Sequence, residues 1–210
     1  DFKRKGVLTE STEKQLFDPK AGMFLPDRFV IGTCPHCQYE RAYGDQCENC
    51  SKYYEQTELI NPKSLLSDAE PVIREARHWH FPLGDFQKKL EAFIESHAGE
   101  WKENVLQQVR SWLKTGLSDR PISRDLTWGV QVPEEDDGKV LYVWFEAVLG
   151  YISATKEWAE AQGDPTLWEK YWKQDDTRYI AFIGKDNIVF HCLMFPAMLM
   201  EKGGFVLPDN

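Results

Sequence analysis

Four of the five cysteines stand at a spacing that could hold a metal ion. They form two hooks, Cys34-Pro35-His36-Cys37 and Cys47-Glu48-Asn49-Cys50, with nine residues between them. Two such hooks can offer four thiolates to one tetrahedral ion, which is the ligand set of structural zinc. We therefore predict one structural Zn²⁺ bound by Cys34, Cys37, Cys47 and Cys50. Because protein thiolates fill all four positions, no position is open for water or substrate, and no catalysis is expected from the metal.

Two other uses of these cysteines fit the sequence less well. A disulfide framework needs an oxidising compartment, and no apolar stretch of signal-peptide length follows the charged residues at the N-terminus. A redox pair needs one C-x2-C hook rather than two. Gly44 and Asp45 supply turn residues between the hooks. His36 is expected to be a solvated loop residue.

The composition limits the classes of protein to which the chain can belong. Its 210 residues carry 25 Lys and Arg against 34 Asp and Glu, a formal net charge of −9, and 42% of them are hydrophobic. This suits one large domain or two small ones with a packed core. The acidic balance disfavours a free-standing nucleic-acid clamp. The longest apolar run, residues 188–200, is too short to span a bilayer. Since the chain does not begin with Met, we expect a piece of a longer protein.

Two amphipathic helices are predicted between residues 85 and 116, after a stretch of loops and short strands around the cysteines. Asp85 is a candidate N-cap of the first helix, and Gly116 is placed to end the second. Each helix has a stripe of apolar and aromatic residues along one face. Such stripes belong to the core far more often than to a binding face, so we assign them to the core. The stripes are Phe86, Leu90, Phe93, Ile94 and His97 in the first helix, and Trp101, Val105, Val109, Trp112 and Leu113 in the second.

The last third of the chain predicts an alternation of strands and helices. The apolar run of residues 140–145 is typical of a strand buried on both faces, and residues 178–183 repeat it. Helices are expected from Gly150 through Trp158, from Asp164-Pro165, and from Asn187 to about Met200. This order is typical of a parallel sheet in an α/β fold. Ligands of such sheets bind beyond the carboxyl ends of the strands, here residues 146–151 and 184–191.

Six short segments, taken together, are specific for one family. They are Gly44-Asp45-Gln46-Cys47, Thr57-Glu58-Leu59-Ile60-Asn61-Pro62, Ile122-Ser123-Arg124-Asp125, Tyr142-Val143-Trp144, Gly150-Tyr151 and Phe182-Ile183-Gly184-Lys185-Asp186. In this order they resemble methionyl-tRNA synthetases, and the resemblance covers nearly the whole chain. It implies that residues 1–139 are a connective-peptide insertion with a zinc knuckle at about 30–55. It also implies that residues 140–210 are the second half of a parallel-sheet, Rossmann-like class I catalytic domain.

The resemblance also assigns residues to two binding sites. A methionine pocket is implied for Trp144, Ala147, Val148, Tyr151, Asn187, His191 and Phe195, and contacts to ATP or the adenylate for Gly184, Asp186 and Arg124. By residue type alone, Trp144 and Phe195 would be core, His191 a satisfied core histidine, and Asp186 a cap in an ordinary turn. Arg124 would form a salt bridge to Asp125 or another carboxylate. Val148 and Glu146 depart from the family, which often has Pro and Asp there.

The activity implied by the resemblance is a cytoplasmic methionine–tRNA ligase, with methionine, ATP with Mg²⁺, and tRNA as partners. Adenylate formation depends on positioning and charge stabilisation, so no catalytic nucleophile is assigned. The His-Ile-Gly-His-type and Lys-Met-Ser-Lys-Ser-type signatures of class I synthetases do not occur in the sequence. The chain alone is therefore expected to be inactive and not to bind nucleic acid tightly. Two rivals stay open: a zinc-ribbon nucleic-acid module, which the net charge disfavours, and a class I synthetase for another amino acid.

A second set of four positions has the spacing of metal hooks but no thiols. Some members of the family carry a second four-cysteine site there, and this chain has Asp18, Ala21, Ser64 and Ser67 instead. One carboxylate and two hydroxyls cannot replace four thiolates for structural zinc, so one ion per chain is predicted. We expect packing of Leu65 and Leu66 against Phe17 and Met23 to offset the lost ligation.

Overall fold

The computed structural model describes residues 1–44, 47–50, 52, 54–126, 128–134 and 138–209, and only the backbone of Asp186. Asp45 and Gln46, which belong to the predicted turn between the cysteine hooks, lie outside the described residues. The chain divides into two compact units. Unit 1 comprises Asp1–Thr9, His80–Ile122 and Leu141–Asn210, and unit 2 comprises Glu10–Trp79 and Ser123–Val140.

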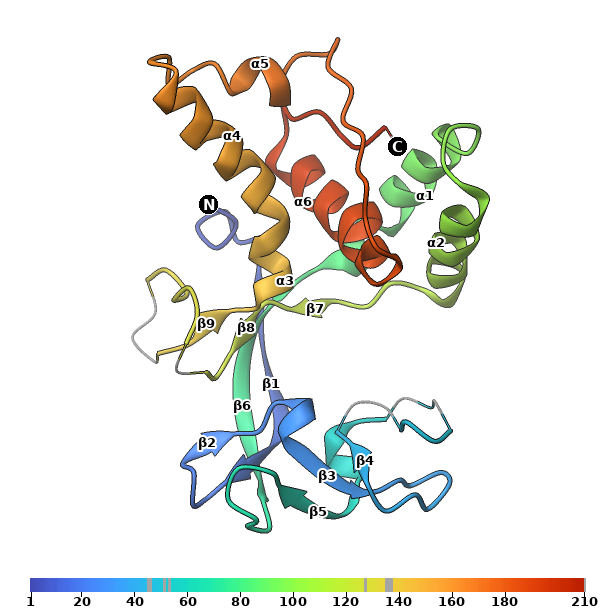
Figure 1. Cartoon of the computed structure of the whole chain (residues 1–210), viewed down its shortest axis with the longest axis vertical. Coiled ribbons are helices and arrows are strands. Elements are labelled where there is room, and N and C mark those ends of the chain that lie inside the picture. The colour runs from blue at the N-terminus through green and yellow to red at the C-terminus, as the bar shows by residue number, and fades with distance from the viewer. Residues whose placement is uncertain (45–46, 51, 53, 127, 135–137, 210) are drawn as a thin grey trace. The chain divides into compact units, whose positions relative to one another are not determined.

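Unit 2 is built mainly from short strands (Figure 1). The first sheet has four strands in the order β2 (Met23–Phe24), β1 (Thr9–Asp18), β6 (Val72–Phe81) and β7 (Arg120–Pro121), of which β7 and the end of β6 belong to unit 1. The second sheet has β3 (Val30–Thr33) between β4 (Ala42–Tyr43) and β5 (Ile60–Ser64). Strands β8 (Ser123–Arg124) and β9 (Val140–Leu141) form a third, two-stranded sheet. Short 3₁₀ helices at Asp27–Phe29 and Gln56–Glu58 connect these elements.

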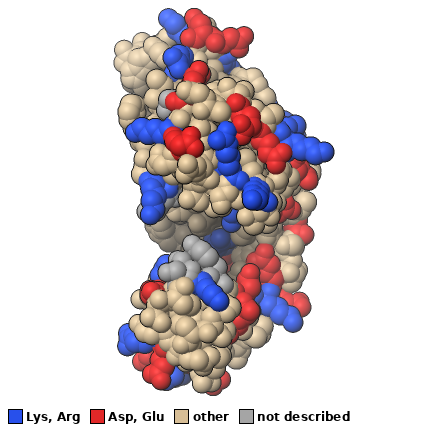
Figure 2. Space-filling view, turned by 90° about the vertical axis from the view of Figure 1, so that its right-hand side faces the viewer, with Lys and Arg blue, Asp and Glu red and all other residues tan. Residues whose placement is uncertain are grey.

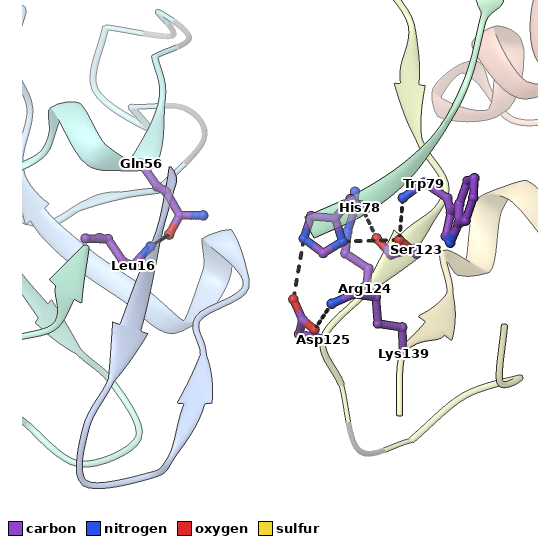
Figure 3. A network of polar contacts seen from close by, with 8 residues as sticks. All are labelled: Leu16, Gln56, His78, Trp79, Ser123, Arg124, Asp125 and Lys139. Atoms are coloured by element: carbon purple, nitrogen blue, oxygen red, sulfur yellow. Dashed lines mark hydrogen bonds and ion pairs between the residues drawn. The ribbon is translucent and has the colours of Figure 1, made fainter. Parts of the chain in front are cut away.

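The core of unit 2 is small and contains two of the cysteines. One buried cluster of described residues consists of Leu16, Leu25, Val30, Cys34, Ala42, Cys47 and Leu59. Gly32 lets β3 approach β5 closely, because a Cβ there would lie 3.0 Å from the carbonyl oxygen of Ile60. The Gln56 side chain accepts a hydrogen bond from the backbone N–H of Leu16 at 3.1 Å (Figure 3). Side-chain contacts thus add to the few ladder bonds that such short strands can make.

Unit 1 is mainly helical. Its helices are α1 (Gln87–Ser96), α2 (Glu103–Thr115), α3 (Val143–Glu146), α4 (Gly150–Ala161), α5 (Glu169–Trp172) and α6 (Phe195–Lys202). Its strand β7 (Arg120–Pro121) pairs antiparallel with the end of β6. Single 3₁₀ turns occupy Leu83–Phe86, Ala147–Leu149 and Lys185–Asn187, and a π-helical turn, Phe190–Met194, leads into α6. None of the helices in the described part of the chain combines the length and apolar character needed to span a bilayer.

The two predicted amphipathic helices are confirmed as α1 and α2. Their buried residues are Leu90, Phe93 and Ile94 in α1, and Leu106, Val109 and Leu113 in α2. Gly116 ends α2 with a φ of 95°, a conformation that favours glycine. The predicted cap is wrong, because the 3₁₀ turn Leu83–Phe86, rather than the Asp85 carboxylate, leads into α1. The predicted helix at Asp164 is a turn, in which Asp164 accepts from the N–H of Thr166 at 2.9 Å, followed by the short α5.

The mixed α/β class is confirmed, whereas the described residues do not form the two predicted parallel strands. The run at residues 140–145 is strand only at Val140–Leu141 and then turns into α3. In residues 178–183 the described backbone makes one isolated parallel bridge, between Tyr179 and Pro208. A buried parallel strand needs hydrogen-bonded neighbours, and the described residues provide too few of them here. As a result Phe182 is 96% exposed.

Candidate functional site

The four cysteine sulfurs converge as structural zinc requires. All four lie within 4.8 Å of one another, with 3.9 Å between the Sγ atoms of Cys34 and Cys50 and 3.6 Å between those of Cys37 and Cys47. A tetrahedron with Zn–S bonds of about 2.3 Å places the sulfurs about 3.8 Å apart, so the donor set fits zinc. All five cysteines belong to the described residues and carry free thiols, and the fifth, Cys192, lies in unit 1. The residues that would hold the ion are Cys34, Cys37, Cys47 and Cys50.

Backbone hydrogen bonds shape both cysteine hooks. The N–H of Cys34 donates to the carbonyl of Tyr39 at 2.8 Å, and the N–H of Cys47 donates to that of Lys52 at 3.1 Å. The N–H of His36 points at the sulfur of Cys34 at 3.4 Å. His36 thus contributes its backbone to the hook. N–H groups aimed at the sulfurs stabilise thiolate ligands.

The second set of hook-spaced positions holds a buried carboxylate network. Ser64 and Ser67 donate their hydroxyls to Oδ2 of Asp18 at 2.5 and 2.6 Å. The N–H groups of Lys20 and Ala21 donate to its Oδ1 at 2.8 and 2.9 Å. Asp18 and Ser64 are fully buried. The Asp18 carboxylate therefore connects the segment of residues 18–21 with the segment of residues 64–67.

The packing predicted for this region is wrong. Leu65 and Leu66 are each 44% exposed, because the backbone between the two serines turns outward while their hydroxyls point inward to Asp18. Hydrogen bonds to a carboxylate, rather than apolar burial, connect the segments here. Ala21 takes part through its backbone N–H alone.

The Asp18 network makes unit 2 sensitive to acid. Burial alone would raise the pKa of the Asp18 carboxyl, but hydrogen bonds from Ser64, Ser67, Ala21 and Lys20 outweigh it and hold the pKa well below its usual value of 3.8. The stability contributed by the ionised group is therefore complete above pH 3.8 and is lost progressively as the pH falls below it. We expect Asp18→Asn to weaken unit 2 at neutral pH, because the amide nitrogen cannot accept from two hydroxyls.

Hydrogen exchange of residues 60–69 measures this effect. In Asp18→Asn the amides there are expected to exchange at least several-fold faster than in the wild type at neutral pH, with a smaller ratio in acid. Asp164→Asn is the matched control, because the pKa of Asp164 is also lowered, mainly by the Thr166 hydroxyl, but in unit 1. Equal protection in Asp18→Asn and the wild type at neutral pH would contradict the expectation.

An aromatic cluster in unit 1 gathers several residues of the predicted methionine pocket. The ring of Trp144 at α3 stacks on that of Phe190, with centroids 5.2 Å apart. Tyr151 of α4 lies beside His191, with its hydroxyl 2.8 Å from Nε2. Trp144 and Tyr151 are 39% and 44% exposed, whereas His191 is buried. The two pairs are linked through Phe190 and His191, which are consecutive residues of the π-helical turn.

The hydrogen bonds of His191 determine its tautomer. Nδ1 lies 3.0 Å from the carbonyl oxygen of Asn187, which can only accept, so Nδ1 carries the proton. Nε2 lies within hydrogen-bond distance of the Tyr151 hydroxyl. The imidazole thus holds Tyr151 in place. His191 lies in the π-helical turn, a local form that is frequent at functional sites.

The other predicted pocket and nucleotide residues occupy different environments. Ala147 is exposed, whereas Val148 and Phe195 are fully buried. Gly184 is exposed at the start of the 3₁₀ turn Lys185–Asn187, whose backbone includes Asp186. Arg124 belongs to unit 2 and donates to the carbonyl of Ser123 at 2.8 Å.

Two aromatic residues of the cluster were not predicted from the sequence. Phe190 stacks on Trp144, and Tyr179 packs against Tyr151 and Phe195 with centroid distances of 6.3 and 6.2 Å. Helical spacing from Asn187 could have indicated Phe190, because residues three and four apart share a helix face. No sequence signal indicated Tyr179. Beyond it lies a cavity of about 450 Å³ lined by Thr155, Trp158, Tyr171, Trp172, Thr177, Arg178 and Tyr179, none of which was predicted as a site residue.

A second polar network surrounds His78 in unit 2 (Figure 3). His78 is buried in β6, and its Nδ1 lies 3.2 Å from the hydroxyl oxygen of Ser123. Its Nε2 lies 3.5 Å from Oδ2 of Asp125. Oδ1 of Asp125 accepts from Nζ of Lys139 at 2.5 Å, and Ser123 Oγ accepts from the N–H of Trp79 at 2.9 Å. Asp125 thus forms an ion pair with a lysine 14 residues away.

The surface charges are mixed in sign. On the face in Figure 2, Lys and Arg side chains are interspersed with Asp and Glu. The described residues on this face therefore offer no broad field of one sign that would attract a phosphate backbone.

Comparisons with known proteins give a consistent picture. The family model described as tRNA synthetases class I (M) matches residues 1–210. The methionine–tRNA ligase of Chlorobaculum tepidum is 58% identical over 219 residues, covering 100% of this chain and 31% of the relative. That of Salinibacter ruber is 59% identical over 213 residues, covering 98% of this chain and 30% of the relative. The chain thus spans about a third of the length of the curated relatives it matches.

Solved structures show a similar fold. Mycobacterium tuberculosis methionyl-tRNA synthetase in its free state matches with a TM-score of 0.60 at 21% identity, covering 100% of this chain and 36% of that one. The same enzyme in complex with methionyl-adenylate matches with a TM-score of 0.60 at 23% identity, covering 99% and 35%.

Proposed function

The chain belongs to the class I tRNA synthetase (M) family, and on this premise we propose that it is the middle part of a methionine–tRNA ligase. Such an enzyme activates methionine with ATP and transfers the aminoacyl group to tRNA in the cytoplasm. The observation that carries the proposal is the 58% identity to a methionine–tRNA ligase over the whole chain. The aromatic cluster around Trp144, Tyr151 and His191 adds support that does not depend on overall identity.

We assign residues 1–139 to a connective-peptide insertion and residues 140–210 to the second half of the Rossmann-like catalytic domain. The exposed apolar side chains of residues 178–183 support the second assignment. Phe182 is exposed on an extended segment. Strands supplied by the remainder of the protein would cover it and complete a parallel sheet. The insertion would hold one Zn²⁺ at Cys34, Cys37, Cys47 and Cys50, where the ion supplies folding free energy rather than chemistry.

The methionine side chain would lie against the aromatic cluster. Its thioether is apolar and polarizable, and contacts between sulfur and aromatic rings are favourable. Trp144 and Phe190 would provide one wall, and Tyr151, held by His191, a polar edge. Ala147, Val148, Asn187 and Phe195 complete the proposed pocket, with the buried Val148 and Phe195 supporting it from beneath.

Activation would join the methionine carboxylate to the α-phosphorus of ATP as pyrophosphate leaves. No protein nucleophile is needed, so the chain contributes positioning and charge stabilisation. Gly184 allows the backbone to approach the nucleotide, Asp186 would bind a ribose hydroxyl or the substrate ammonium, and Arg124 would stabilise the phosphates or the carboxylate. ATP would enter with Mg²⁺ as part of the substrate, and tRNA would receive the aminoacyl group.

Amino-acid-dependent exchange of pyrophosphate into ATP by the full-length protein tests the function. Among all proteinogenic amino acids, methionine is expected to support the fastest exchange. Trp144→Ala is expected to raise the KM for methionine by about 10- to 100-fold, because it removes a wall worth about 1–3 kcal/mol in such pockets. Trp158→Ala is the matched control, since Trp158 is similarly exposed on α4 but contacts Tyr171 instead.

Preference for leucine, isoleucine, valine or cysteine would assign the chain to another class I synthetase. Salt-dependent binding of the chain to arbitrary duplexes, without any exchange activity of the full-length protein, would favour a nucleic-acid module instead. The isolated chain is expected to show no exchange, because the phosphate-binding signatures lie outside its sequence.

A further inference from the structure

One buried imidazole contacts both neighbours of Arg124. His78 lies on β6 and reaches Ser123 through Nδ1, at 3.2 Å, and Asp125 through Nε2, at 3.5 Å (Figure 3). Arg124 stands between these two residues on the chain. All of them belong to unit 2, so their relative placement is defined within one compact body.

The hydrogen bonds to Ser123 place the ring proton of His78. Ser123 Oγ accepts from the N–H of Trp79 at 2.9 Å, so its own proton is available to Nδ1 of His78. Nε2 then carries the imidazole proton and lies 3.5 Å from Asp125 Oδ2, a charge contact longer than a hydrogen bond, while Lys139 donates to the other carboxylate oxygen at 2.5 Å. Burial lowers the pKa of His78, although Asp125 opposes this effect, which agrees with a neutral ring.

The network fixes the position of β8 against β6. The backbone hydrogen bonds of so short a strand cannot fix that position alone. Strand β8 has two residues, Ser123 and Arg124, and the side-chain contacts connect positions 45 residues apart in sequence. Burying polar groups costs free energy unless they are paired. An apolar side chain at position 78 could fill the same volume but could not specify where Ser123 and Asp125 lie. The contacts of His78 with Ser123 and Asp125 therefore fix the position of the Arg124 backbone.

We propose that His78 is a positioning residue that fixes Arg124 within unit 2, and that the role of Arg124 toward the phosphates or the substrate carboxylate in methionine activation depends on it. The inference rests on the role given to Arg124 in the proposed function. His78 itself touches neither substrate nor nucleotide. Through Ser123 and Asp125 it fixes the backbone on both sides of Arg124. The Nη1 of Arg124 donates to the Ser123 carbonyl at 2.8 Å, and this hydrogen bond orients the guanidinium.

A double-mutant cycle in the full-length enzyme tests the inference. The variants are His78→Gln, Arg124→Ala and the combination of both, measured by methionine-dependent pyrophosphate exchange. We expect His78→Gln to lower kcat by about 10-fold or more, as misplacement of a charge-stabilising group does, with the KM for methionine changed less than about twofold. In the Arg124→Ala background the same substitution is expected to have almost no further effect on kcat.

Ser123→Ala in the same cycle covers the case in which His78→Gln does not fold, because it removes one contact without removing the ring. Ser123→Ala is also expected to lower kcat, and again only when Arg124 is present. His80→Gln is the matched control: His80 is buried two residues further along β6, and its variant is expected to keep kcat within about twofold of wild type.

The possible results separate the inference from the function on which it rests. If Arg124→Ala lowers kcat and His78→Gln lowers it by the same factor with and without Arg124, the inference is overturned while the function stands. If Arg124→Ala leaves exchange unchanged, the role of Arg124 is wrong and the inference falls with it. If the enzyme shows no methionine-dependent exchange, the proposed function itself is wrong.

Discussion

Removal of zinc is expected to unfold residues 30–55 while α1 and α2 keep their structure. The strands around the cysteines are short: β3 has four residues and β4 has two. Two of the seven described residues in the buried cluster around the cysteines are the proposed ligands Cys34 and Cys47. Apparent binding free energies of structural zinc are about 10–16 kcal/mol in small metal-dependent folds, so little remains to hold this region without the ion. Helices α1 and α2 bury Leu90, Ile94, Leu106 and Val109 in unit 1 and do not depend on it.

Hydrogen exchange after chelation decides this expectation. Amides of residues 30–55 should lose protection, and those of α1 and α2 should retain it. Cys37→Ser should reproduce the effect of chelation, whereas Cys192→Ser, which alters a buried cysteine of unit 1, should not. Uniform loss of protection along the chain, or retained protection at residues 30–55, would show that the metal is not the local source of stability.

The expected stoichiometry follows from the same structure. Metal analysis of protein purified without added zinc should return close to one ion per chain. At the second set of hook-spaced positions, the oxygens of the Asp18 carboxylate already accept hydrogen bonds from Ser64, Ser67 and two backbone N–H groups. A value near two would contradict this assignment.

The features predicted correctly from the sequence depend on local spacing. Four thiols at fixed intervals give a metal site almost regardless of the surrounding fold, and helical periodicity gave α1 and α2. Residues 140–145 were misassigned because a short apolar run suits a strand and a buried helix equally well. Here the helix begins at Val143, directly after two residues of strand. Residues 178–183 need partner strands, and a pattern in one segment cannot show whether its partners are present.

The polar networks could not be predicted because their members are ordinary residues far apart in sequence. Ser64 and Asp18 are separated by 46 positions and His78 and Ser123 by 45. No spacing rule connects such pairs, and a serine or histidine considered alone is more often a solvated or satisfied residue. The resemblance identified Asp18, Ser64 and Ser67 as replacements for thiols, but only the structure shows that the carboxylate connects them. His78 and Tyr179 were not singled out at all.

Phe195→Ala is expected to destabilise unit 1 by about 3–5 kcal/mol, the usual cost of deleting a large buried aromatic side chain. Phe195 is fully buried, and its ring contacts those of Tyr151, Trp172 and Tyr179 at centroid distances of 6.1 to 6.4 Å. The cavity left by the ring would lie directly beneath the Tyr151–His191 pair. The variant should therefore lose both stability and methionine activation, whereas a residue that only contacts substrate would lose activation alone.

Trp144→Ala provides the contrast that separates these two roles. Trp144 is partly exposed and stacks on a single ring, so its truncation should weaken methionine binding while changing the unfolding free energy by less than about 1.5 kcal/mol. Denaturant unfolding of the full-length protein, followed by hydrogen exchange of residues 188–202, measures the difference. If Phe195→Ala retained the protection of α6 and altered only the KM for methionine, Phe195 would be a substrate contact rather than the core support of the pocket. A loss of protection confined to Phe195→Ala would confirm that one face of α6 supports the aromatic surface on which the proposed activity depends.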